Sequence, residues 1–165
     1  MITAATSIDS HVLDVSPDSY MRIRAVSEAD YDQWLPLWRD YQGFYKTTID
    51  ESTSETTWKR FLDPAEPVCC AVAEDEHQLI GIVHFIFHRS CWTEGDYVYL
   101  QDLFVDPSIR GKGVGRALIE HVVSRAREAG ASRVWWLTHE SNGQAMLLYD
   151  RIAEKSGFIQ YRKLL

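Results

Sequence analysis

The segment from Tyr97 to Val123, "YVYLQDLFVDPSIRGKGVGRALIEHVV", constrains the fold of this chain more than any other part of the sequence. A nearly continuous apolar run comes first, then a turn with three glycines in five residues, then apolar residues at helical spacing. Such runs are typical of strands buried on both faces, and glycine allows the backbone angles of a tight turn. The segment therefore predicts a buried strand, a glycine loop and a helix.

The glycine loop also gathers positive charge at the start of the predicted helix. Arg110, Lys112 and Arg116 surround its glycines. Backbone N–H groups and the helix dipole at a helix N-terminus bind anions. The loop consequently has two interpretations, a plain strand-to-helix turn and a site for an anionic group.

Two well-known phosphate-binding patterns do not fit this loop. A P-loop requires Ser or Thr after its lysine, but Gly113 follows Lys112. A dinucleotide-binding fingerprint requires a glycine where this chain has Arg116 or Leu118. The pattern that remains is R-x-x-G-x-G, at residues 110–115.

The rest of the chain alternates between strand-like and helix-like segments. Residues 1–20 show no clear period and are interpreted as an N-terminal tail, before one domain at 21–165. The expected strands are 21–26, 67–75, 78–88, 95–107, 132–140 and 157–165, and the expected helices are 29–45, one that Pro64 ends, 114–129 and 142–155. This order predicts an α/β fold with a mixed, largely antiparallel sheet flanked by helices.

Composition excludes some classes of function. A net charge of −7 argues against a nucleic-acid surface. Cys69, Cys70 and Cys91 lie in no metal-binding spacing, so we expect buried free thiols and no metal. No signal peptide or membrane-spanning run is recognised, so the protein is expected to be cytoplasmic without membrane contact.

Two motifs in the right order carry a resemblance to a known family. The first is Arg110, Gly113 and Gly115; the second comprises Asn142, Ala145, Leu148, Tyr149, Gly157 and Phe158. Together they resemble the GNAT superfamily, the Gcn-related N-acetyltransferases, and look closest to the yeast histone, polyamine and D-amino-acid branch and its bacterial relatives. The interval from Tyr149 to Gly157 is longer than in many members.

The resemblance implies acetyl-CoA as cosubstrate and a set of residues that bind it. In that family the glycine loop binds the pyrophosphate, the preceding strand pairs with the pantetheine arm, and the tyrosine of the second motif protonates the departing thiolate. The coenzyme-binding residues implied here are Leu103, Phe104, Val105, Arg110, Gly111, Lys112, Gly113, Val114, Gly115, Arg116, Asn142 and Tyr149. Tyr149 is the implied general acid.

The general base is harder to assign from the sequence. Related polyamine acetyltransferases have a glutamate where this chain has Gln101, and an amide cannot accept the proton. Asp102 is the nearest carboxylate and our candidate base, although alternation along a strand places it on the opposite face from Gln101. His139 and Glu140, at the end of a later strand, are the alternatives.

The acceptor is expected to be a primary amine of a small molecule such as a polyamine or an amino acid, attacked directly in a ternary complex. Tyr41, Phe44 and Tyr45 are candidates for the border of its site. A protein lysine is the alternative acceptor, and a non-catalytic acyl-CoA-binding module or a plain structural domain are the alternative classes. Relatives often form dimers, so a homodimer is expected, with the terminal strand as an exchange element.

Overall fold

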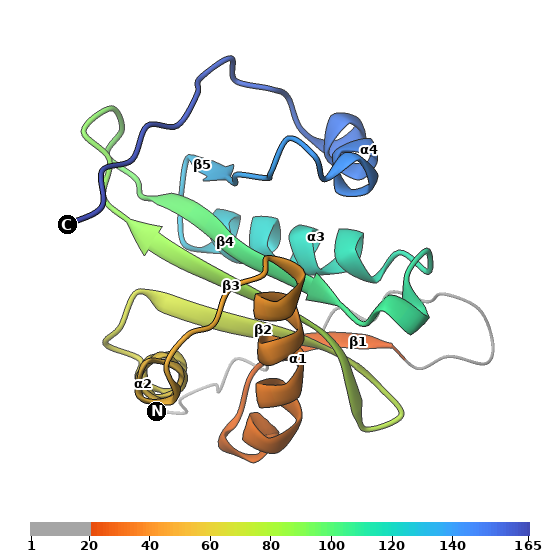
Figure 1. Ribbon diagram of the computed structural model, residues 1–165. Helices are drawn as coiled ribbons and strands as arrows, with labels where there is room; N and C mark the ends of the chain where they lie inside the picture. The colour runs from red at the N-terminus through yellow and green to blue at the C-terminus, as the bar shows by residue number, and fades with distance from the viewer. Residues whose placement is uncertain (1–20) are drawn as a thin grey trace, which may run out of the picture.

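The computed structural model describes residues 21–165, so the predicted N-terminal tail at 1–20 lies outside the described residues. A single five-stranded sheet runs through the described part in the order β1-β2-β3-β4-β5. Its strands are β1 (Arg22–Ala25), β2 (Val68–Asp75), β3 (Gln78–His88), β4 (Tyr97–Val105) and β5 (Arg133–Trp135). Strands β1 to β4 pair antiparallel and β5 pairs parallel to β4 (Figure 1), which confirms the predicted mixed, largely antiparallel sheet.

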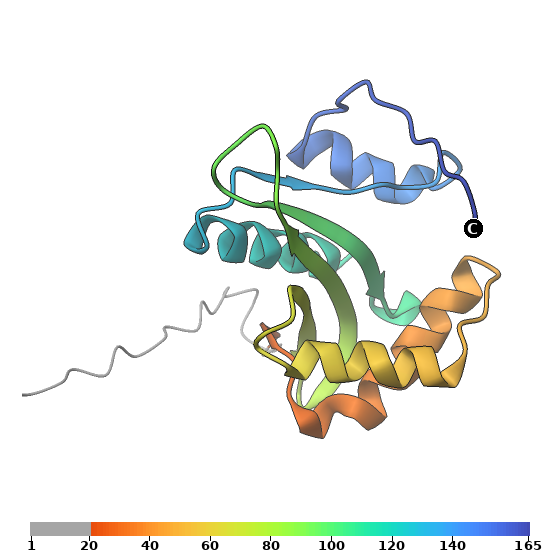
Figure 2. The same ribbon diagram turned by 90° about the vertical axis from the view of Figure 1, so that its left-hand side faces the viewer.

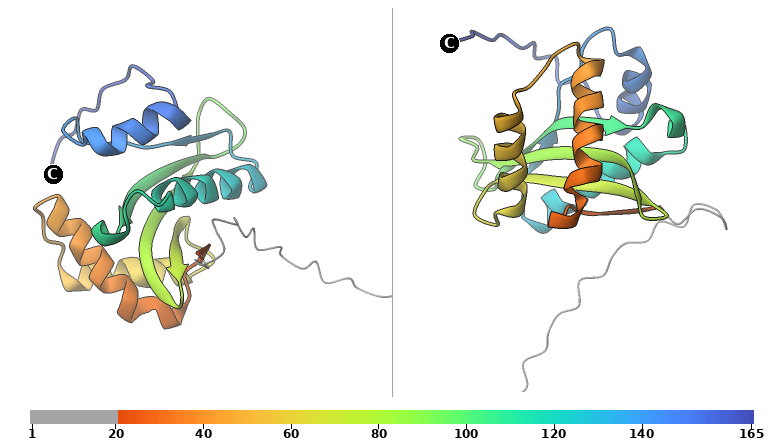
Figure 3. Two further views of the ribbon diagram at one scale, coloured as in Figure 1. Left: turned by 90° about the vertical axis from the view of Figure 1, so that its right-hand side faces the viewer. Right: turned by 60° about the horizontal axis from the view of Figure 1, so that its bottom comes forward.

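Helices cover both faces of the sheet (Figure 3). The helices are α1 (Tyr31–Phe44), α2 (Glu51–Leu62), α3 (Val114–Glu128) and α4 (Gly143–Ile152), with short 3-10 turns η1 (Glu28–Asp30) and η2 (Pro107–Ile109). Helices α1 and α2 lie on one face, where Trp34, Trp38 and Trp58 are buried against the sheet. Helix α3 lies on the other face and buries Leu118 and Val122.

Strand β4 is paired along its whole length on one side only. It pairs with β3 as far as Val105, but its pairing with β5 stops at Tyr99 and Trp135. Beyond Trp135 the chain leaves β4 and continues into α4, as Figure 1 shows. The backbone of β4 after Tyr99 therefore has no neighbouring strand on its β5 side.

A β-bulge interrupts the register between β3 and β4. His84 pairs with Asp102, whereas the next residue, Phe85, pairs with Leu100, so Gln101 is the extra residue. A bulge breaks the alternation of faces along its strand. Val98, Leu100, Leu103 and Val105 pack on the α3 side, and the sequence expectation that Gln101 and Asp102 face opposite ways is wrong.

The C-terminal part departs from the sequence prediction. Strand β5 ends at Trp135 instead of 140, and α4 ends at Ile152, where Ala153 adopts an extended conformation. Residues 153–165 form no strand, and Figure 2 shows them running past α4 as an irregular segment. Phe158 and Tyr161 are 86% and 88% exposed, so the apolar pattern that predicted a strand finds no partner within the described chain.

The prediction that the cysteines are buried has a mixed outcome. Cys69 and Cys70 do pack into the two different cores, as expected for neighbours on a strand, but Cys91 is exposed.

None of the helices at 21–165 has the length and apolar character that crossing a membrane requires.

A buried ion-pair network joins β1, η1 and β2 and makes stability depend on pH. Both Nη atoms of Arg24 donate to Asp30 at 2.6 and 2.7 Å, and its Nε donates to Glu74 at 2.6 Å. The hydrogen bonds from Arg24, and those from Ser27, lower the pKa of Asp30 to about 2 from 3.8, against the opposing effect of burial. The contribution to stability is complete above the unfolded-state pKa and is lost as the pH falls towards 2.

Replacement of Asp30 by asparagine should therefore lower the unfolding free energy at pH 7 by about 2 kcal/mol, since one pKa unit corresponds to about 1.4 kcal/mol. Urea unfolding of both proteins at pH 7, 4 and 2.5 measures the effect. The wild type should lose more stability than Asp30→Asn as the pH falls from 4 to 2.5. Asp32→Asn, at an exposed position of α1, is the matched control. An equal loss of unfolding free energy in the wild type and in Asp30→Asn would contradict the lowered pKa of Asp30.

Candidate functional site

The glycine loop joins the end of β4 to the start of α3. Asp106 accepts a hydrogen bond from the Ser108 backbone N–H at 2.8 Å and begins the turn η2. Gly111 and Gly113 then adopt left-handed φ values of 87° and 83°, which favour glycine. Gly113 is the N-cap of α3 and offers no side chain to its first N–H groups.

This loop fits an anionic group such as a pyrophosphate. The first N–H groups of any helix have no partner within it, and here no capping side chain covers them. A Cβ at Gly111 or Gly113 would have no atom within 4 Å, so the space beside the backbone is open. Lys112 is exposed in the loop, whereas the charge of Arg116 is partly compensated by Glu120 at 2.6 Å.

The end of β4 provides the unpaired backbone edge next to this loop. Phe104 is buried in the core under α1 and α2, while Leu103 and Val105 pack on the α3 side. Their side chains thus hold the strand in place, and no strand pairs with their backbone on the side where β5 has ended. The Val105 carbonyl accepts a hydrogen bond from Nε of Arg110 at 3.4 Å. An extended ligand can be bound there as an added strand.

Asp102 is held in the core by a hydrogen-bonded chain that starts at Trp34. The Trp34 Nε1–H donates to Nε2 of His84 at 3.0 Å, and Nδ1 of His84 lies 3.0 Å from Oδ2 of Asp102. An indole N–H can only donate, so Nε2 accepts and the proton of His84 is on Nδ1. His84 is then a neutral donor to the Asp102 carboxylate, and its tautomer fixes where that carboxylate points.

Three tyrosines lie near Asp102. Burial raises the pKa of Tyr41, Tyr45 and Tyr99, and the Asp102 carboxylate adds to each shift. A hydrogen bond from Asn142 opposes the shift at Tyr45. These hydroxyls therefore remain protonated at neutral pH around a single carboxylate.

Helix α4 brings the second sequence motif to this cluster. The side-chain oxygen of Asn142 accepts from the backbone N–H of Ala145 at 3.4 Å and caps α4, which leaves its amide nitrogen for Tyr45. Tyr149 packs against Trp136, with ring centroids 5.4 Å apart. Burial, with a smaller contribution from Tyr45, raises the pKa of Tyr149 above its usual value of 10. The structure thus brings Tyr149, Asn142 and Asp102 to the same group of tyrosines.

Other candidates from the sequence lie elsewhere. His139 and Glu140 are exposed beyond β5, and Nδ1 of His139 lies 2.7 Å from the hydroxyl of Ser141. Phe44 is half exposed, with the guanidinium of Arg110 5.9 Å from its ring centre. The role of Trp34 and His84 in holding Asp102 was missed, because only the paired register of β3 and β4 shows that His84 and Asp102 are neighbours.

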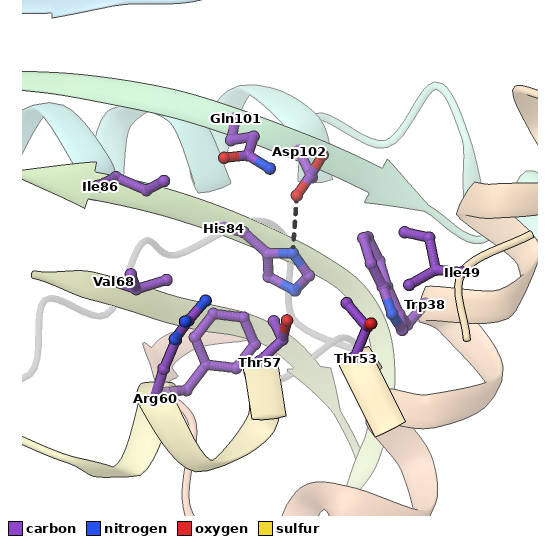
Figure 4. Close-up of a pocket in the computed structure, with 11 residues that line it drawn as sticks. Trp38, Ile49, Thr53, Thr57, Arg60, Val68, His84, Ile86, Gln101 and Asp102 are labelled. Atoms are coloured by element: carbon purple, nitrogen blue, oxygen red, sulfur yellow. Dashed lines mark hydrogen bonds and ion pairs between the residues drawn. The ribbon is translucent and has the colours of Figure 1, made fainter. Parts of the chain in front are cut away.

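A pocket of about 200 Å³ opens beside Asp102, between the sheet and α2 (Figure 4). Asp102, Gln101 and His84 lie at one end, and Arg60 of α2 lies at the other. Thr53 and Thr57 contribute hydroxyls, and the remaining lining is apolar: Trp38, Ile49, Phe61, Val68 and Ile86. Because of the bulge, Gln101 and Asp102 both line this pocket although they are adjacent in the strand.

Comparison with known proteins places this geometry in a family. The pattern of the acetyltransferase (GNAT) family matches residues 26–153. The D-amino-acid N-acetyltransferase of Saccharomyces cerevisiae is 39% identical over 143 residues, covering 86% of this chain and 89% of that protein. The thialysine N-epsilon-acetyltransferase of Mus musculus is 29% identical over 155 residues, covering 86% and 91%.

The fold is also shared with a solved acetyltransferase. An aminoglycoside N-acetyltransferase in complex with CoA superposes with a TM-score of 0.76 at 21% identity, covering 90% of this chain and 98% of that one. The chain therefore belongs to the GNAT family of acetyltransferases. It is an acetyl-CoA-dependent N-acetyltransferase.

Proposed function

We propose that this enzyme acetylates a primary amine of a small molecule, a polyamine or an amino acid, by direct attack in a ternary complex. Acetyl-CoA supplies the activated acetyl group as a thioester. Asp102 accepts the proton of the amine, and Tyr149 donates a proton to the departing thiolate. The observation that carries the proposal is the position of Asp102. It lines a pocket, and it belongs to β4, the strand whose unpaired backbone leads into the glycine loop.

The bulge in β4 supports Asp102 as the base. Relatives with a glutamate at the position of Gln101 present their carboxylate from that place on the strand. Here the amide of Gln101 cannot accept a proton, but the bulge turns Asp102 towards the same pocket. A neutral His84 that donates to Asp102 stabilises the carboxylate form, which is the form a general base needs.

The loop between β4 and α3 supports binding of the coenzyme. The open N-terminus of α3 and the exposed Lys112 suit the pyrophosphate, with Arg110 beside the loop. The backbone of Leu103, Phe104 and Val105 suits the pantetheine arm, because β5 no longer covers it. Asn142 and Tyr149 come near Tyr45 from the side of α4.

The cysteines support direct attack rather than an acyl-enzyme. Burial raises the pKa of the Cys70 thiol well above its usual value, and burial also raises that of Cys69. Thiols with raised pKa values are poor nucleophiles at neutral pH. Cys91 lies in the loop between β3 and β4, outside the lining of the pocket.

The relatives support a small amine as the acceptor. The yeast relative acts on D-amino acids and the mouse relative on thialysine, as their names state. Both acceptors are amino acids, and both carry a primary amine. A pocket of about 200 Å³ has the volume of about seven water molecules at roughly 30 Å³ each, which suits a molecule of this size.

Replacement of Asp102 by asparagine tests the base. The amide oxygen can still accept from His84, so folding should be retained, but no proton can be taken from the amine. We expect kcat/KM at pH 7.5 to fall about 100-fold or more, the usual scale of general base catalysis, with the affinity for acetyl-CoA within about threefold. Amine-dependent release of CoA measures turnover, and calorimetry measures binding.

A second substitution distinguishes a missing base from general damage to the site. Adding Gln101→Glu to Asp102→Asn puts a carboxylate back into the same pocket, at the position that relatives use. At least tenfold recovery of kcat/KM is expected from the double variant. Unchanged turnover in Asp102→Asn would show that Asp102 is not the general base. If the double variant recovers no activity, the carboxylate is required at position 102 itself.

A further inference from the structure

The pocket beside Asp102 carries one charge of each sign. Of its 11 lining residues, Asp102 is the anion and Arg60 the cation, while His84 is held neutral by Trp34. Figure 4 shows Arg60 and Asp102 on opposite sides of His84, with Thr57 on the same side as Arg60. A ligand that spans this pocket meets a carboxylate at one end and a guanidinium at the other.

Arg60 differs from the other arginines near this face of the sheet. Arg24 is tied to Asp30 and Glu74, and Arg39 lies 3.7 Å from Glu51. No carboxylate of residues 21–165 forms an ion pair with Arg60. Its guanidinium is thus available, and a guanidinium binds carboxylates with two parallel hydrogen bonds.

We propose that Arg60 binds the carboxylate of the acceptor and that the enzyme acetylates a small amino acid in preference to a polyamine. The reacting ammonium, such as the ε-ammonium of lysine, faces Asp102, where it loses its proton. The carboxylate, several bonds away at the other end of the molecule, faces Arg60 and the hydroxyl of Thr57. The inference rests on the proposed function, because it concerns the acceptor of the same transfer.

Electrostatics separates the two classes of acceptor. A polyamine carries a second ammonium, which would lie against Arg60 without a carboxylate to compensate it. Acidic residues that might have served a polycation lie outside the lining of the pocket: Glu51 pairs with Arg39 and Asp96 pairs with Arg89 at 3.1 Å. The charges of this pocket therefore match a zwitterion.

The experiment compares acceptors that differ only in the carboxylate. D-lysine and L-lysine are paired with cadaverine, and spermidine is added as the polyamine. Steady-state kinetics are measured for the wild type, Arg60→Gln and Arg60→Lys. Lys59→Gln is the matched control, because Lys59 is an exposed cation of the same helix that does not line the pocket.

For at least one amino acid, Arg60→Gln should raise KM about 10- to 100-fold with kcat nearly unchanged, the scale of a charge-assisted hydrogen bond. The KM of Arg60→Lys should lie between those of the wild type and Arg60→Gln, because lysine keeps the positive charge but cannot form the two parallel hydrogen bonds. KM for the matching decarboxylated amine should not rise in either variant, and Lys59→Gln should change nothing. The proposal is overturned if the wild type prefers the decarboxylated amines or spermidine, or if Arg60→Gln affects acids and amines alike.

A binding measurement keeps this inference separate from the proposed function. Trp38 lines the pocket, so its fluorescence should change when lysine binds, without any turnover. Binding that weakens in Arg60→Gln but not in Lys59→Gln supports the carboxylate site, even if no acceptor of the panel is acetylated. In that case only the proposed acetyl transfer is contradicted. Acetylation of amines with no dependence on Arg60 overturns the carboxylate site alone.

Discussion

Replacement of Gly115 by aspartate is expected to abolish acetyl-CoA binding while leaving the fold at least as stable as the wild type. Gly115 is in the first turn of α3, and an added Cβ would meet only Val105 Cγ2, at an ordinary 3.8 Å. A carboxylate in the first turn stabilises a helix through its dipole, and loss of a helical glycine adds to this. The same charge would lie where the pyrophosphate is expected to bind, so repulsion should weaken the coenzyme about 100-fold or more.

Position 115 is preferable to its neighbours for this experiment. Gly111 and Gly113 have left-handed φ values, so a side chain at either would strain the loop and confuse folding with binding. Gly115→Ala is the matched control, because it adds the Cβ without charge and should bind the coenzyme nearly as well as the wild type. Thermal unfolding and calorimetric titration with acetyl-CoA measure the two effects. Retained affinity in a folded Gly115→Asp protein would return the loop to the status of a plain turn.

Most of the fold could be predicted because its elements carry local patterns. The buried strand at 97–105 and the amphipathic helix at 114–128 follow directly from runs and spacing. The C-terminal segment could not be predicted in this way. Its apolar residues suit a strand, but a strand also requires a partner, and residues 157–165 pair with no strand of the described chain. Pairing is a property of the whole sheet, so the local pattern alone was insufficient.

Sequence motifs predicted some residues of the candidate site. Residues whose position depends on how β3 and β4 pair were missed. Tyr149 and Asn142 belong to a spaced motif, and both come near Tyr45, while their roles stay predictions. The bulge at Gln101 has no local signature, and it changes which face Asp102 occupies. Trp34 and His84 are 50 residues apart, so the hydrogen bond that fixes the tautomer of His84 emerges only from the packing of α1 on β3.

Replacement of Tyr149 by phenylalanine is expected to lower kcat about 100-fold or more, the usual scale of a general acid, with little change in coenzyme affinity. The ring contact with Trp136 is kept by phenylalanine, so the packing of α4 should survive. Only the proton that the departing thiolate needs is lost. Trp136→Phe, which keeps an aromatic ring but changes the packing, is a control for displacement of α4 and should have a much smaller effect on kcat.

The pH dependence provides an independent check on Tyr149. A general acid must hold its proton, and burial raises the pKa of Tyr149 above 10. Ionisation of Tyr149 should therefore not cause a decline in kcat between pH 7 and 9. An alkaline limb below pH 9 that disappears in Tyr149→Phe would contradict the direction of this shift, and an unchanged kcat would remove Tyr149 from the reaction.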